Sequence, residues 1–89
     1  MYIVTKLSDY LNSGCEVKIK FVSMIKEDCK QFIMNDSGAV YSSLLKNGYK
    51  KEDVVTSDHL DTHGTGYNPS FVVAIHDMDD RDIWEIHEV

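Results

Sequence analysis

The fold is decided near the C-terminus by residues 71–88, which read FVVAIHDMDDRDIWEIHE. Two apolar runs flank a polar centre, and this pattern predicts a β-hairpin. A turn centred on residues 79–80 places Ile75 opposite Trp84. One face of the hairpin then carries the large apolar side chains Phe71, Val73, Ile75, Trp84 and Ile86. Because side chains alternate along a strand, we expect this face to lie in the core.

The opposite face of this hairpin is mixed in character. Its residues are Val72, Ala74, His76, Ile83, Glu85 and His87. A face of this kind can be covered by another copy of the chain. A dimeric structural or assembly subunit that associates through the mixed face, a homodimer, is therefore one interpretation of the sequence.

Upstream of the hairpin, the pattern predicts alternating elements. Residues 5–14 have helical spacing, with Gly14 in place to end a short helix. Residues 16–21 alternate strictly and predict a strand with Val17, Ile19 and Phe21 inward. Residues 29–34 predict a second strand, followed by a turn at residues 35–38, Asn-Asp-Ser-Gly.

Two segments in the middle of the chain are less determined. Residues 39–41 fit a returning strand. The alternative is that they begin a helix that runs through Leu44 and Leu45 with Ser37 as its cap, and we favour the strand. Residues 44–60 predict a helix that breaks at Asn47 and Gly48, and residues 61–70 predict a loop.

Together these elements predict an α+β fold in one domain spanning residues 1–89. We expect a small, mainly antiparallel sheet of four to five strands, with one or two helices packed on one face. The composition, 43% hydrophobic and 27% charged, excludes collagen-like, low-complexity and strongly disordered classes.

The cysteines and the apolar runs indicate the cellular compartment of the protein. The N-terminus lacks the pattern of a secretory signal, and no apolar run approaches the roughly 20 residues of a membrane span. We therefore expect a cytoplasmic protein that does not enter a membrane. Cys15 and Cys29 are then expected to be reduced, small core or edge residues rather than catalytic thiolates.

The charge is divided unevenly along the chain. Residues 1–51 hold eight lysines and five acids, a net of +3, whereas residues 52–89 hold ten acids and only Arg81 as a base, a net of −9. The negative field of the C-terminal half disfavours direct binding of nucleic acid and favours a basic protein partner.

One stretch could carry metal or ligand chemistry. In a helix, His59 and His63 would share a face at a spacing that binds divalent metals. Leu60 stands where a zinc protease needs its glutamate, and no third ligand is marked. We therefore predict no metal, no cofactor and no catalytic residues, and keep a small-ligand or metal-binding protein or enzyme built on Asp58–Tyr67 as an alternative.

The acids around the last hairpin are the densest chemical feature. In the expected register Asp77 and Asp82 oppose each other, which destabilises the strand ends. Such crowding suggests a binding role, because carboxylates on a rigid hairpin accept charge-assisted bonds from Lys and Arg. The predicted contact residues are Asp77, Asp79, Asp80, Asp82 and Glu85, with Asp58 and Asp61 at the rim.

The interpretation that we favour is a small, acidic, non-enzymatic interaction protein. It would act as an inhibitor or regulator whose acidic C-terminal half docks on a basic, DNA-binding protein and occupies the nucleic-acid surface. In size and acidity the chain resembles the small acidic inhibitors that phages make against host DNA-binding proteins, and this resemblance implies nucleic-acid mimicry.

Overall fold

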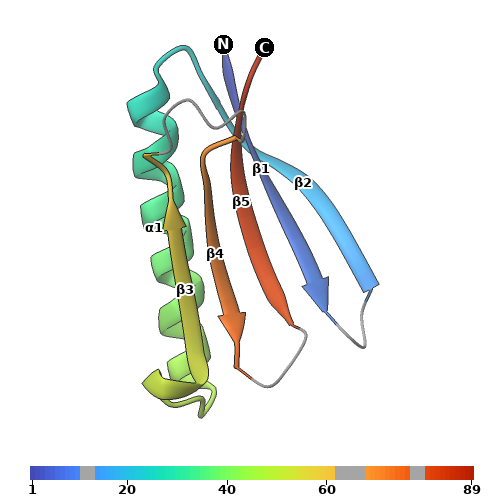
Figure 1. The fold of residues 1–89 in the computed structure, drawn as a ribbon, viewed down its shortest axis with the longest axis vertical. Helices are drawn as coiled ribbons and strands as arrows, with labels where there is room; N and C mark the ends of the chain where they lie inside the picture. The colour runs from blue at the N-terminus through green and yellow to red at the C-terminus, as the bar shows by residue number, and fades with distance from the viewer. Residues whose placement is uncertain (11–13, 62–67, 77–79) are drawn as a thin grey trace.

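The structure, a computed structural model, describes residues 1–10, 14–61, 68–76 and 80–89. The described elements form one antiparallel sheet with a single long helix against it, which confirms the α+β prediction (Figure 1). Along the chain they are β1 (Tyr2–Tyr10), β2 (Gly14–Ser23), α1 (Lys26–Lys46), the short 3₁₀ helix η1 (Lys51–Asp53), β3 (Val54–His59), β4 (Ser70–Ile75) and β5 (Arg81–Glu88). The strand order is β2-β1-β5-β4-β3.

The last hairpin is present as β4 and β5, but its register differs from the expected one. Trp84 lies opposite Phe71 rather than Ile75. The difference is four residues, an even number, so every side chain keeps its predicted face. The predicted opposition of Asp77 and Asp82 is wrong, because Asp82 lies opposite Val73 in β4.

The predicted helix over residues 5–14 is wrong, because residues 2–10 form strand β1. This strand lies between β2 and β5 and pairs with both along nearly its whole length. A strand bonded on both sides satisfies its backbone groups, and the β-branched run Ile3–Thr5 favours extended backbone. Gly14 then begins β2 with a φ of 79°, which suits glycine.

A β-bulge reverses part of the predicted facing of β2. Phe21 pairs with Val4, whereas Ile19 pairs with the next residue of β1, Thr5, so Lys20 has no partner of its own. One extra residue exchanges the two faces of a strand. Phe21 therefore turns toward the helix, and Val17 and Ile19, predicted to be inward, are 62% and 66% exposed on the other side of the sheet.

Three predictions are wrong here, namely the strand over 29–34, the turn at 35–38 and the strand at 39–41. All three segments lie within helix α1. Its buried positions, Cys29, Ile33 and Ser37, are spaced by four residues, as on one helix face. Two of the turn-forming residues make bonds that suit a helix. The Asp36 carboxylate accepts a hydrogen bond from the indole of Trp84 at 2.9 Å, and the buried Ser37 hydroxyl donates to the Met34 carbonyl at 3.3 Å.

Gly38 is the weak position of this helix and gives a direct test of its register. A Cβ added there would meet no atom within 4 Å. We expect Gly38→Ala to raise the free energy of unfolding by about 0.5–1 kcal/mol, because alanine restricts the unfolded chain and favours helix. Urea denaturation followed by circular dichroism measures the change.

The matched control is Gly48→Ala just beyond the helix. Gly48 has a φ of 102°, where a side chain is strained even though space is open. This variant should lose stability by about 1 kcal/mol. If Gly38→Ala were as destabilising as Gly48→Ala, residue 38 would lie in a turn and not in a helix.

The predicted helix over 44–60 is also wrong beyond Lys46. The chain turns at Asn47 and Gly48, as expected, but then forms η1 and the edge strand β3. β3 pairs with β4 from Val54 opposite Ile75 to His59 opposite Ser70. Val54 is the buried residue that fixes this strand against the core.

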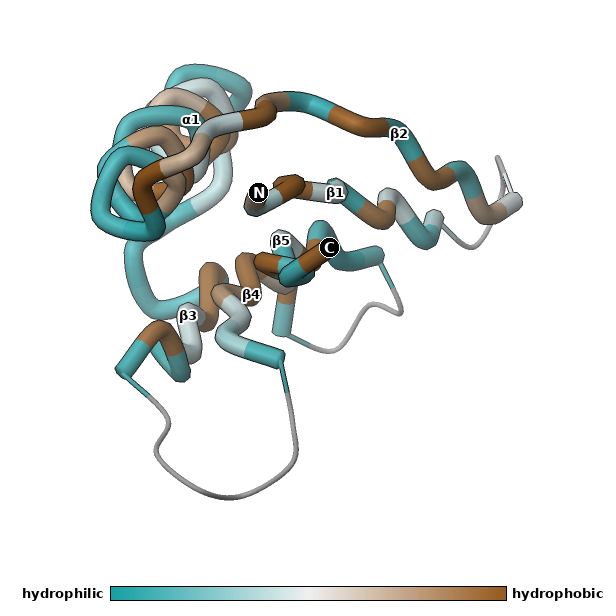
Figure 2. The backbone as a smooth tube through the Cα atoms, turned by 90° about the horizontal axis from the view of Figure 1, so that it is seen from above, coloured by the Kyte–Doolittle hydropathy of each residue, from teal (hydrophilic) through white to brown (hydrophobic). Residues whose placement is uncertain are grey.

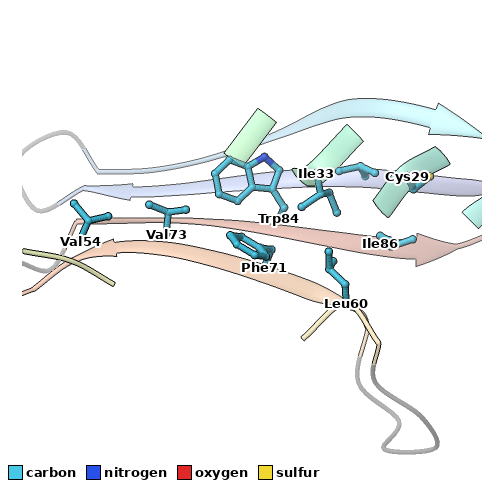
Figure 3. Packing of buried hydrophobic residues seen from close by; sticks show 9 residues of the cluster. Cys29, Ile33, Val54, Leu60, Phe71, Val73, Trp84 and Ile86 are labelled. Carbon is cyan, nitrogen blue, oxygen red and sulfur yellow. The ribbon is translucent and has the colours of Figure 1, made fainter. Parts of the chain in front are cut away.

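Helix α1 lies on one side of the sheet (Figure 2). The core forms between α1 and the sheet, with Trp84 and Ile33 fully buried near its centre (Figure 3). Phe21 of β2 stacks on Phe32 of α1 with ring centroids 4.8 Å apart, which joins the bulged strand to the helix. The buried apolar residues are Val4, Cys29, Ile33, Val54, Leu60, Phe71, Val73, Trp84 and Ile86.

Candidate binding surfaces

A cavity of about 500 Å³ lies beside the C-terminal half of α1. Its volume is within the range of small-molecule sites. One wall is apolar and comes from the helix, the segment after it and β4. The residues of that wall are Val40, Leu44, Tyr49, Val73 and Ile75. The other wall is polar and includes Lys6, Tyr10, Asp80 and Asp82.

Asp82 is a buried carboxylate at this cavity, with 4% of its surface exposed. Its Oδ1 accepts two hydrogen bonds of 2.8 Å, from the hydroxyls of Ser8 and Tyr10 in β1. Burial, then the hydrogen bond to Asp82, raises the pKa of Tyr10 to about 12. The phenol therefore stays protonated as a donor to Asp82 at neutral pH.

Two cations lie near Asp82, and each contacts another group. The Lys6 ammonium is 5.2 Å from the centre of the Trp84 ring, within cation–π distance. The Arg81 guanidinium lies 3.5 Å from the carboxylate of Asp9. Asp9 is on the face of the sheet that points away from α1. The cavity thus combines apolar walls with two aspartates, one lysine and one arginine.

The structure does not gather the predicted contact residues into one surface. Asp80 lies at the β4–β5 end of the sheet, where its carbonyl accepts from the backbone of Ile75 at 3.1 Å. Asp58 and Asp61 lie at the other end of β3, beside the Ser70 end of β4. Asp61 forms a 2.7 Å ion pair with Lys30, and this bond raises the pKa of Lys30.

The remaining predicted contact residues also lie apart from one another. Asp82 is buried, so a partner meets its carboxylate only through the cavity. Glu85 faces away from α1, 3.9 Å from His87. Asp77 and Asp79 lie outside the described residues. The sequence carries a signal for an inward Asp82, because Asp82 alternates with Trp84 and therefore shares the core face.

Two acids that are not among the predicted contact residues, Glu52 and Asp53, lie near Asp80. The carbonyl of Asp53 accepts from the His76 amide at 2.7 Å, which places Glu52 and Asp53 of η1 beside the end of β4. Lys50 and Lys51 are adjacent. The charge at this end of the molecule is therefore mixed outside the cavity.

The premise of the metal hypothesis is wrong. Asp58 and His59 belong to strand β3, so His59 cannot share a helix face with His63, which lies outside the described residues. Among the residues that the structure describes, no three His, Cys, Asp or Glu side chains are grouped to hold a metal ion.

The cysteines are placed as predicted, one in the core and one at an edge. Cys29 is fully buried, and burial followed by the nearby Asp28 raises the pKa of its thiol. Cys15 is exposed in the edge strand β2.

The side of the sheet that faces away from α1 is a second candidate surface, here called the open face. Its central feature is an unbroken line of apolar residues across four paired strands, here called the apolar row. The apolar row consists of Val17, Leu7, Ile83 and Val72, each opposite the next. Val17 and Ile19 of β2 and Val55 of β3 are exposed on this face. Apolar patches of this extent are characteristic of interaction sites.

Comparison with known proteins found no matching family model, no similar curated protein and no similar solved structure. Within the described part of the chain, α1 and η1 are both too short or too polar to cross a bilayer.

Proposed function

We propose that the protein is a non-enzymatic interaction protein whose acidic C-terminal half binds a basic protein partner as an inhibitor or regulator. Support comes from the strand order, which places β5, β4 and β3 next to each other. The strands of the segment with a net charge of −9 are therefore neighbours at one edge of the sheet. An excess of negative charge there steers and orients an oppositely charged partner.

The observation that carries the proposal is the cavity with the buried Asp82. A lysine or arginine side chain has an aliphatic stem and a cationic end. Val40, Leu44 and Val73 offer apolar surface to the stem, and Asp80 and Asp82 offer carboxylates to the cation. Because charge-assisted bonds are strong where water is excluded, one inserted side chain could anchor the complex. The inserted side chain is then a Lys or Arg of the partner, and nucleic-acid-binding proteins carry such residues on their binding surfaces.

The test is a nuclear magnetic resonance titration of the full chain with a lysine-rich peptide. We expect the methyl resonances of Val40, Leu44 and Val73 to shift on binding. Asp80→Lys should weaken binding on the order of tenfold or more, because it replaces attraction by repulsion at the cavity. Binding should also fall steeply with salt.

The matched control is Asp61→Lys, which makes the same change in net charge at the far end of β3. It should weaken binding by no more than about threefold, through the long-range field alone. Equal losses for the two variants would show that the peptide responds only to net charge, and would contradict the cavity as the site. Shifts confined to the open face would contradict it as well.

The cavity volume favours one second candidate, a small-ligand-binding protein. A ligand with an apolar body and a cationic group would meet the same walls. This site replaces the Asp58–Tyr67 segment considered from the sequence. Titration with a small amine such as N-acetyl-lysinamide separates the candidates, since saturation by the amine alone favours a small ligand and a requirement for a longer peptide favours a protein partner.

A further inference from the structure

The open face has a charge pattern that is complementary to itself. The paired residues form parallel rows across the sheet, with the apolar row between two rows that carry charged residues on the central strands. On one side lies the row with Asp9 and Arg81, which pair with each other across β1 and β5. On the other side lies the row with Thr5 and Glu85. Arg81 and Glu85 therefore stand two residues to either side of Ile83 on the same strand.

We propose that a second copy of this chain packs on the open face, related by a two-fold axis that runs along the apolar row. Such an axis leaves each residue of the apolar row facing its own copy. It also places Arg81 of each protomer opposite Glu85 of its partner, so the interface contains two equivalent charge pairs. A self-complementary patch of this kind is what a closed two-fold dimer requires.

The position of these charges in the sheet strengthens the argument. β5 is the middle strand of the five. Two twisted sheets that pack face to face cross at about 30°, so facing strands separate toward the edges and stay aligned at the centre. Arg81, Ile83 and Glu85 all lie on the central strand, where alignment is retained.

The area of the open face agrees with this occupant. Five strands spaced by about 4.8 Å, each with about four outward residues, cover roughly 600 Å² per copy and roughly 1,200 Å² in the pair. That is the lower end of the range for specific interfaces. We therefore expect a reversible dimer with a micromolar dissociation constant rather than an obligate one.

The bulge at Lys20 has a consequence for this surface. Without the extra residue, Val17 and Ile19 would share the face of Phe21. The bulge instead extends the apolar surface of the open face onto β2, where both side chains are mostly exposed. A second copy covers them and so explains exposed apolar residues on an edge strand.

The test measures the mass of the full chain by sedimentation equilibrium over increasing protein concentration. We expect the mass to rise from the 10.2 kDa of the monomer to twice that value. Val17→Asp should keep the chain monomeric, because it places a carboxylate within the apolar row. Its control is Lys18→Asp, one residue along β2 but on the other face, and this variant should dimerise as the natural chain does.

Charge exchange tests the two-fold arrangement. Arg81→Glu and Glu85→Arg each place like charges opposite one another twice in the dimer, so each should weaken association on the order of tenfold or more. The double variant restores opposite charges and should return the dissociation constant to within about threefold of the natural value. Circular dichroism of every variant establishes that the monomer remains folded.

Three results would overturn the proposal. The first is a monomer at millimolar concentration. The second is a dimer that Val17→Asp leaves intact, which would place association at another surface such as the β2 edge. The third is a double charge variant as weak as either single one. None of these results bears on the basic-partner proposal, whose cavity lies on the α1 side of the sheet.

Discussion

Replacement of Trp84 by alanine is expected to lower the free energy of unfolding by about 3–5 kcal/mol. Trp84 is fully buried between the sheet and α1, and its ring meets Phe71 edge to face at 6.5 Å. Its indole N–H donates to Asp36 within the helix. Small domains are stable by about 5–15 kcal/mol, so we expect the alanine variant to lose a large share of its folded population.

Trp84→Phe separates packing from the hydrogen bond. It keeps an aromatic ring against Phe71 but removes the donor to Asp36, and we expect a loss of about 1–3 kcal/mol. Urea denaturation must be followed by circular dichroism, since Trp84 is the only tryptophan of the chain. Met24→Ala, at a residue that is 75% exposed, is the control and should change stability by less than about 0.5 kcal/mol. An equally small effect for Trp84→Ala would contradict the described core.

Alkaline titration is expected to destabilise the fold through Tyr10. Its pKa rises from 10.0 to about 12 on folding, since burial and the hydrogen bond to Asp82 favour the neutral phenol. A raised pKa means that the folded state holds its proton more tightly than the unfolded chain. The stabilising contribution is therefore complete below pH 10 and is lost as the pH approaches about 12.

Stability measured by urea denaturation at intervals from pH 9 to 12 shows this loss, and absorbance of the phenolate follows the titration itself. Tyr10→Phe should be less stable at pH 9, because it lacks the bond to Asp82, and should lose less stability above pH 10. If Tyr10→Phe lost stability above pH 10 as steeply as the natural chain does, another group would be responsible for the alkaline loss.

The C-terminal hairpin illustrates what alternation can establish. Residues 71–75 and 83–88 are strands, and their faces are as predicted although the register is shifted by four residues. The face on which a side chain lies depends only on whether its position along the strand is odd or even. A register shift by an even number of residues therefore preserves the face. The register itself depends on the length of the turn and on the neighbouring β1, which the hairpin sequence does not specify.

The candidate cavity could not be predicted as a unit. The sequence predicts Asp82 as a surface contact, although its alternation with Trp84 and Ile86 indicates the core face. Lys6 and Tyr10 join it because β1 is a strand beside β5, and Val40 and Leu44 join it because residues 26–46 are a helix. The local sequence instead predicts a helix over residues 5–14 and a strand over residues 39–41.

The sequence by itself determined the α+β class, the core face of the last hairpin and the separation of charge between the two halves of the chain. Each of these follows from composition or from a period of two along one segment. Only the tertiary structure decided that residues 35–38 are helical, that the bulge at Lys20 turns Val17 and Ile19 outward, and that Asp82 lies inside. These outcomes depend on contacts between distant residues, such as Asp36 with Trp84 and Tyr10 with Asp82. Local propensities differ by only about 1 kcal/mol per residue, so contacts of this kind outweigh them.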